Sequence, residues 1–209
     1  TFYTALYHTM LGPIIYEDID GKYKGLDKNI YTSDGFTNYT IFSLWDTYRA
    51  LHPLFNIIQT ERNNDMIKSM LAHQNQSVHG MLPIWSHYAN ENWCMIGYHA
   101  TSVIADAITK NVGNFNKLDA LEACISTSNV SYFDGIESYI KKGFVPEDIS
   151  GSSVSKTLEF AYNDWCIAQV SDELNNENTT SEYLKRSESY RNLYDSKIGF
   201  MRPKLNNGN

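Results

Sequence analysis

The chain has 209 residues, of which 42% are hydrophobic and 20% charged, and its 24 acidic against 17 basic residues leave a net charge of −7. The acidic balance argues against a nucleic-acid partner, because phosphates are bound by faces rich in Lys and Arg. The ordinary apolar content argues against general disorder, and no apolar run approaches the ~20 residues that cross a bilayer, so no membrane span is expected.

The predicted elements begin with the end of a helix at residues 1–11. Residues 12–37 are predicted to be a long loop, because glycines and aspartates are interspersed there, and loops of this length are usually functional or disordered. A second loop, rich in His and aromatic residues, is expected at 76–93.

The apolar spacing of the other segments predicts helices. They are expected at 39–51, 61–74, 94–109, 117–126, 135–142, 152–174 and 181–193. Ser152 is expected to cap the first turn of the longest of them, and Thr179 with Glu182 forms a capping-box pattern for the last. No segment alternates with a period of two, so the predicted class is all-α, built of antiparallel helical hairpins. Residues 1–209 show no linker and are expected to lack an internal boundary.

Three cysteines and fifteen tyrosines are the other compositional features. Cys94, Cys124 and Cys166 lack any CxxC spacing and are expected to be small buried hydrophobes. The tyrosines are compatible with ring-stacking pockets or with a Tyr-rich helical core. The chain begins at Thr1 without Met or a leader, so we expect a piece of a longer protein whose export signal lies outside it.

An aspartate-rich stretch is the first candidate site. Asp18, Asp20 and Gly21 resemble the first half of a calcium loop, but the closing position is Asn29 rather than Glu. Turn chemistry is therefore the favoured interpretation.

A second candidate is the Trp45-Asp46-x-x-Arg49 sequence. Asp46 and Arg49 are three residues apart and are compatible with an ion pair on a helix face. Alternatively, Asp46 accepts hydrogen bonds from vicinal sugar hydroxyls while Trp45 provides an apolar platform.

Polar and aromatic residues crowd the segment 85–99. Cys94 and His99 are five residues apart, a poor spacing for a metal on one helix face, although a Cys–His nucleophile pair stays open. A lone buried His is more often a hydrogen-bonded core residue. On the long helix, Lys156 and Glu159 are expected to form a surface pair, and Asp164 a half-exposed position.

Six blocks of the chain resemble one enzyme family. They are FYTALYHTMLGP (2–13), DIDGKYKGLD (18–27), GFTNYTIFSLWDTYRALHPL (35–54), ENWCMIGYHATSVIADA (91–107), SVSKTLEFAYNDWCIAQ (153–169) and GFMRPK (199–204). In this order they closely resemble the α-mannosidases of glycoside hydrolase family 92 and cover nearly the whole chain.

The resemblance implies removal of terminal α-linked mannose, typically α-1,2-linked, from glycans with inversion and with dependence on Ca²⁺. It implies a fold that forms part of an (α/α)6 toroid, in a bacterial enzyme that is periplasmic or secreted. The family's catalytic acid and base come from motifs absent here, and its calcium-contacting segment is also expected outside this chain. We therefore expect no catalytic residue and no metal ligand within 1–209, and expect the remaining segments of the same enzyme as partners.

The resemblance assigns substrate contact to five residues: Trp45, Asp46, Glu91, Cys94 and His99. Asp46 matches the acid that binds mannose hydroxyls, and Trp45 adjoins it. The other three belong to a block in which Asn92 replaces the family's usual Thr. Rival interpretations are a different toroid glycosidase, a non-catalytic glycan-binding helical module and a helical scaffold without a sugar site.

Overall fold

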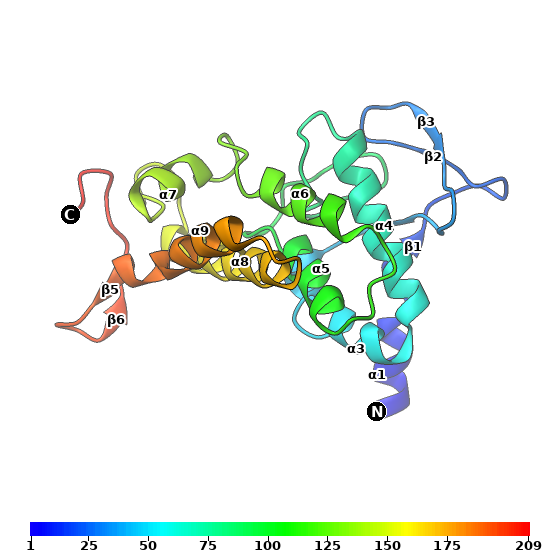
Figure 1. Cartoon of the computed structure of the whole chain (residues 1–209), viewed down its shortest axis with the longest axis horizontal. Coiled ribbons are helices and arrows are strands. Elements are labelled where there is room, and N and C mark those ends of the chain that lie inside the picture. Colours follow the sequence, from blue (N-terminus) through cyan, green and yellow to red (C-terminus); the bar gives the residue numbers. More distant parts are fainter.

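The two longest C-terminal helices form the middle of the molecule in the computed structural model, which describes residues 1–209 (Figure 1). Helices α8 (Ser153–Glu173) and α9 (Glu177–Ser187) run antiparallel, because only three residues join them and they pack along their length. Helix α5 (Ala100–Thr109) packs on α8. Phe160 and Ile167 of α8 have no exposed surface and belong to the main apolar core.

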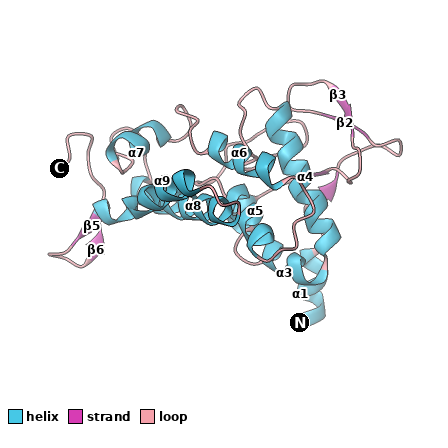
Figure 2. Ribbon diagram, in the orientation of Figure 1, coloured by secondary structure: helices cyan, strands magenta, loops and turns pink.

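The N-terminal third contains short strands as well as helices (Figure 2). Helix α1 (Phe2–Thr9) has no buried residue. Strand β1 (Ile14–Ile15) pairs antiparallel with β4 (Tyr39–Thr40), and β2 (Lys22–Lys24) pairs with β3 (Ile30–Thr32). The all-α expectation is therefore corrected to a mostly helical chain with small two-stranded sheets, and the expected loop 12–37 contains two hairpin strands.

The helix predicted at 39–51 is wrong in position. After β4 the chain is not helical, Ile41 has a left-handed backbone with a φ of 63°, and only Leu44–Thr47 forms helix α2. The next helix, α3 (Leu51–Ile58), begins where the prediction ended and is followed by α4 (Thr60–Gln76). The residues Tyr39 to Ile41 have side chains that favour strands, and backbone pairing with another segment outweighs their apolar spacing.

The remaining helices confirm the predictions with shifted ends. They are α6 (Lys117–Thr127), α7 (Ile136–Lys142) and a 3₁₀ helix η1 (Glu188–Leu193), which is followed by the pair β5 (Tyr194–Asp195) and β6 (Phe200–Met201). The predicted helix 94–109 begins only at Ala100, because Met95 and Gly97 adopt positive φ.

Two predicted caps are wrong, for identifiable reasons. Ser152 has a left-handed backbone and makes no capping bond, and the Glu147 carboxylate instead accepts from the Ser153 N–H at 3.2 Å. Helix α9 starts earlier than expected because Asn176 caps it through the Thr179 N–H.

The helices of this chain do not by themselves form a ring (Figure 1). The α8–α9 pair is the clear hairpin among them. Large apolar side chains on several elements face solvent, among them Tyr3, Tyr162 and Trp165. None of the helices has the length and apolar content that a bilayer crossing requires.

Candidate functional site

Residues Trp45 and Asp46 are positioned by an extended segment that pairs with a loop far along the chain. The Phe42 N–H donates to the Ser86 carbonyl at 3.1 Å, and the Leu44 N–H approaches the Ile84 carbonyl at 3.4 Å. Phe42 and Leu44 are almost fully buried. Trp45 and Asp46 follow in the first turn of α2, where Trp45 is half-buried and Asp46 is exposed.

Arg49 does not pair with Asp46, so the ion-pair interpretation of their spacing is wrong. Its guanidinium lies over the Trp45 ring at 4.4 Å and over the Tyr48 ring at 4.8 Å. The carboxylate it pairs with is that of Glu159 on α8, at 3.7 Å between Nη2 and Oε1. Asp46 instead accepts a short hydrogen bond from the Ser43 hydroxyl.

His99 is buried between Tyr48, Glu159 and Asn163. Its ring stacks on Tyr48 with centroids 4.1 Å apart and planes within 5°. Its Nε2 lies 2.9 Å from Glu159 Oε2, and its Nδ1 lies 3.0 Å from the Asn163 side-chain amide. Gly97 is required beside it, since a Cβ there would lie 2.4 Å from the ring.

The tautomer of His99 follows from the hydrogen bonds of Asn163. The Tyr98 backbone N–H donates to Asn163 Oδ1 at 2.8 Å, so the NH₂ group of Asn163 must face His99 and donate to Nδ1. The imidazole hydrogen is then on Nε2, which lies 2.9 Å from Glu159 Oε2 but is not aligned with that oxygen for a hydrogen bond. Because Nδ1 accepts from Asn163 and Nε2 faces Glu159, the structure provides Cys94 with no base at His99, which argues against a Cys–His nucleophile pair.

The electrostatics favour an ionised Glu159 beside a neutral His99. Burial lowers the pKa of His99, although Glu159 opposes that shift. Burial also resists ionisation of Glu159, but His99 and Arg49 outweigh it and hold the Glu159 pKa below its ordinary value. The predicted surface pair of Lys156 with Glu159 is wrong, because Lys156 lies 2.5 Å from Asp134.

Glu91 is buried and acts as an acceptor for its own loop. Its carboxylate oxygens accept from the backbone N–H groups of Ile84, Trp85, Asn92 and Trp93 at 2.8–3.1 Å. Burial raises the pKa of Glu91, and these four donors oppose the rise. Glu91 thereby shapes the 84–93 loop on which the segment before Asp46 rests. Its contact with substrate stays a prediction, as does that of the half-buried free thiol of Cys94.

A groove lies beside the Arg49 side chain. It has a volume of about 340 Å³ and is lined in part by Tyr48, Arg49, Tyr162 and Trp165. Asp46 lines none of the larger pockets of the chain, so these residues alone do not enclose a cavity around it.

No group of three or more His, Cys, Asp or Glu side chains is arranged to hold a metal ion. Asp20 pairs with Lys22 at 2.5 Å, and Gly21 has a φ of +76° in a tight turn. The turn interpretation of this stretch is therefore confirmed, and the donor set offers no site to which the expected Ca²⁺ can be assigned.

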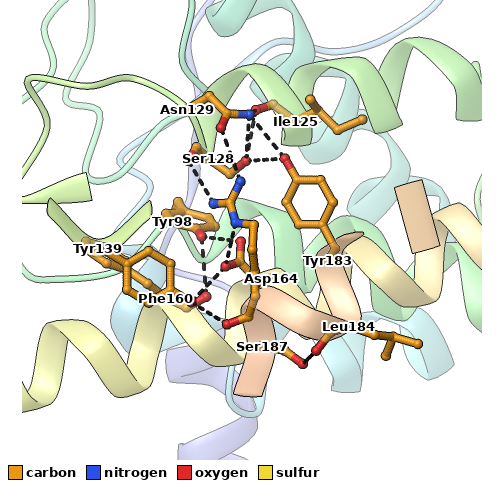
Figure 3. A network of polar contacts seen from close by, with 11 residues as sticks. Tyr98, Ile125, Ser128, Asn129, Tyr139, Phe160, Asp164, Tyr183, Leu184 and Ser187 are labelled. Carbon is orange, nitrogen blue, oxygen red and sulfur yellow. Dashed lines mark hydrogen bonds and ion pairs between the residues drawn. The ribbon is translucent and has the colours of Figure 1, made fainter. Parts of the chain in front are cut away.

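Asp164 is completely buried, contrary to the half-exposed position expected for it (Figure 3). Its carboxylate accepts from the Tyr98 hydroxyl at 2.7 Å, the Tyr139 hydroxyl at 2.8 Å and Arg186 Nε at 3.1 Å. Burial raises the pKa of Asp164 to about 6, against the opposing effect of Arg186 and the two tyrosines. This network ties α8 to α9 and α7 and has a structural role.

The structure adds Glu159 and Asn163 to the candidate residues predicted from the sequence. They are four residues apart on α8 and therefore share one face of the helix. That spacing, inside a block that already resembled a family motif, was the available signal. Of the predicted residues, the structure brings Trp45 and His99 together through Arg49 and Glu159.

Comparison with known proteins identifies what the chain is similar to. A family model described as the glycosyl hydrolase family 92 catalytic domain matches residues 1–209. A family 92 α-mannosidase of Bacteroides thetaiotaomicron, solved with mannoimidazole, has a TM-score of 0.98 and 53% identity over 100% of this chain and 28% of that one. A family 92 inverting mannosidase of the same species has a TM-score of 0.90 and 34% identity over 100% of this chain and 29% of its own. A protein of Arthroderma benhamiae described as an uncharacterized secreted glycosidase is 25% identical over 236 residues, which cover all of this chain and 26% of that protein.

Proposed function

Because this chain belongs to the family of the glycosyl hydrolase family 92 catalytic domain, we propose that it contributes one wall of the active site of an α-mannosidase. The proposed enzyme removes terminal α-linked mannose, preferentially α-1,2-linked, from glycans with inversion. The observation that carries the proposal is the 53% identity to an α-mannosidase over the whole of this chain. The chain spans only 28% of that relative, so the activity belongs to the whole protein.

Trp45 and Asp46 are the residues proposed to meet the sugar. An ionised carboxylate accepts bidentate hydrogen bonds, which suits vicinal hydroxyls of mannose. Asp46 is exposed and lacks a cationic partner, and only its Oδ2 accepts a hydrogen bond within the chain, from Ser43, so Oδ1 is available to a ligand. The half-buried Trp45 ring next to it is proposed to pack against the apolar face of the sugar.

Hydrolysis with inversion requires a general acid and a general base about 6.5–9.5 Å apart, with water between them. We propose that both carboxylates come from other segments of the enzyme, as do the ligands of Ca²⁺. The part proposed for this chain is to hold and orient the mannose.

A secreted or periplasmic location is proposed for the enzyme. Its support is the relative described as a secreted glycosidase. The proposed substrates are α-mannoside glycans, and the other proposed partners are the remaining segments of the same protein.

The test uses the full-length protein with Ca²⁺ and α-1,2-mannobiose, and follows the released sugar by proton NMR. Inversion predicts that β-mannose is seen first and that the α-anomer appears only by mutarotation. Early α-mannose would contradict inversion. Failure to release mannose from any α-mannoside would contradict the enzymatic proposal, and binding without release would favour a glycan-binding module.

A further inference from the structure

Asp46 and Arg49 have the spacing of an ion pair and yet do not form one. Residues 44–47 are helical, Tyr48 keeps a helical backbone, and Arg49 follows in the turn, three positions after Asp46. Nevertheless, the Arg49 guanidinium lies over Trp45 and is directed to Glu159 Oε1. The carboxylate that Arg49 approaches therefore comes from α8, not from its own segment.

Glu159 is well suited to that competition because its other oxygen is already fixed. Its side chain is 20% exposed, and His99 Nε2 lies 2.9 Å from Oε2. His99 is in turn held by Asn163 and by stacking on Tyr48. The protonated Nε2 of His99 thus lies close to one Glu159 oxygen, while the other oxygen lies toward Arg49.

The Trp45 ring provides a second attraction for Arg49. A guanidinium over an indole face at 4.4 Å gains a cation–π interaction, and the Tyr48 ring adds another at 4.8 Å. The Arg49 Nε also donates to the Trp45 carbonyl at 3.1 Å. Together these contacts bind the arginine on the side of Glu159.

We propose that Glu159 is a positioning residue that withholds Arg49 from Asp46 and so keeps the Asp46 carboxylate free to accept hydrogen bonds from the sugar. This inference rests on the proposed function. An arginine paired with Asp46 would occupy the same oxygens that vicinal hydroxyls need, because carboxylates bind guanidinium groups bidentately. Asn163 and His99 act through Glu159 by fixing its orientation.

The first variant is Glu159→Gln in the full-length enzyme. Glutamine keeps the shape and retains an acceptor for His99, but it no longer attracts Arg49 as an ion. We expect Arg49 to turn to Asp46 and kcat/KM for α-1,2-mannobiose to fall by about ten- to 150-fold, the loss for a charge-assisted hydrogen bond. Glu159→Asp keeps the carboxylate on a side chain one methylene shorter. Its kcat/KM should lie between the values of the wild type and of Glu159→Gln.

The decisive variant is the double change Glu159→Gln with Arg49→Met. If Glu159 acts by withholding Arg49, removal of the arginine restores most of the lost kcat/KM. If Glu159 has only a structural role or contacts the sugar itself, the double variant is as poor as Glu159→Gln or worse, and the proposal is wrong. The matched control is Glu137→Gln, which removes an exposed carboxylate paired with Lys141 and should keep wild-type kinetics.

Crystal structures of the full-length wild type and Glu159→Gln give a readout that needs no turnover. The proposal expects Arg49 within ion-pair distance of Asp46 in the variant, and an unmoved Arg49 over Trp45 overturns it. A wild-type enzyme that is inactive on α-mannosides would refute the proposed function, whereas an active enzyme in which Glu159→Gln has wild-type kinetics would refute only the role of Glu159. Should Glu159→Gln fold poorly by its melting temperature, Glu159→Asp with and without Arg49→Met makes the same comparison.

Discussion

Replacing Arg186 by Met should destabilise the protein more than replacing an exposed arginine. The change leaves the buried carboxylate of Asp164 without its cationic partner. The Asp164 side chain has no exposed surface, and that of Arg186 is 13% exposed. Removing one partner of a buried ion pair typically costs about 3–5 kcal/mol. The hydroxyls of Tyr98 and Tyr139 still donate to Asp164 and keep the loss within this range.

The loss of folding stability in this variant should be larger at higher pH. At lower pH the Asp164 carboxyl binds a proton and no longer needs a cationic partner. A carboxyl whose pKa is higher in the folded than in the unfolded state binds its proton more tightly when folded, so stability falls as pH rises through that interval. In the wild type this pH interval ends at the pKa of Asp164 in the folded state, which is about 6. Without Arg186 the pKa of Asp164 rises further, so the variant should lose more stability than the wild type as pH rises from 5.5 to 7.5.

The measurement is the melting temperature of the full-length protein at both pH values. Arg191→Met is the control, since Arg191 is an exposed partner of Glu188 and such pairs contribute about 0–1 kcal/mol. We expect Arg186→Met to lower the melting temperature by several degrees, and by more at pH 7.5. An effect as small as that of Arg191→Met, or one that is equal at the two pH values, would refute this reasoning.

The other predictions concern the site, its loop and a buried histidine. Asp46→Asn should lower kcat/KM for α-mannosides about ten- to 150-fold with an unchanged melting temperature, because Asn loses the charge and half the acceptor capacity; near-wild-type kinetics would contradict the sugar contact. Glu91→Gln should lower the melting temperature through unpaired backbone N–H groups, each worth about 1–3 kcal/mol, and circular dichroism melts will detect it. Burial lowers the pKa of His52 to about 4. The neutral, buried imidazole therefore contributes about 3 kcal/mol of folding stability that is complete above pH 6.5 and is lost as pH falls toward 4. His52→Asn should flatten the fall of the melting temperature over this pH range. The 209 residues alone should not release mannose from an aryl α-mannoside with Ca²⁺, because two carboxylates are the minimum for this chemistry, and turnover above a heat-killed control would contradict this.

Helices with a clear apolar spacing of their own were predictable from the sequence. Helices α4, α6 and α8 begin and end within a few residues of the predicted positions, since periodicity and local propensity agree there. The segment 39–51 was not predictable in this way, because Phe42 and Leu44 are held by hydrogen bonds to residues more than 35 positions away. Such pairing leaves no local pattern.

The same limit applies to the candidate site. The sequence identified Trp45 and Asp46, which are neighbours, but Glu159 reaches Arg49 across 110 positions. Glu91 was assigned to substrate contact from its motif, while its four backbone donors are revealed only by the folded loop. Contacts between residues that are distant in the sequence were not predictable from it and became visible only in the folded structure.

The carboxylate of Glu91 has a consequence for the thermodynamics of ligand binding. A loop that must become ordered when a sugar arrives loses conformational entropy, and fixing the backbone of one residue costs about 1–2 kcal/mol. The loop 84–93 is already held around Glu91 by four backbone N–H groups. The backbone beneath Asp46 has therefore lost this freedom during folding, and a sugar arriving there meets a surface that needs little further ordering.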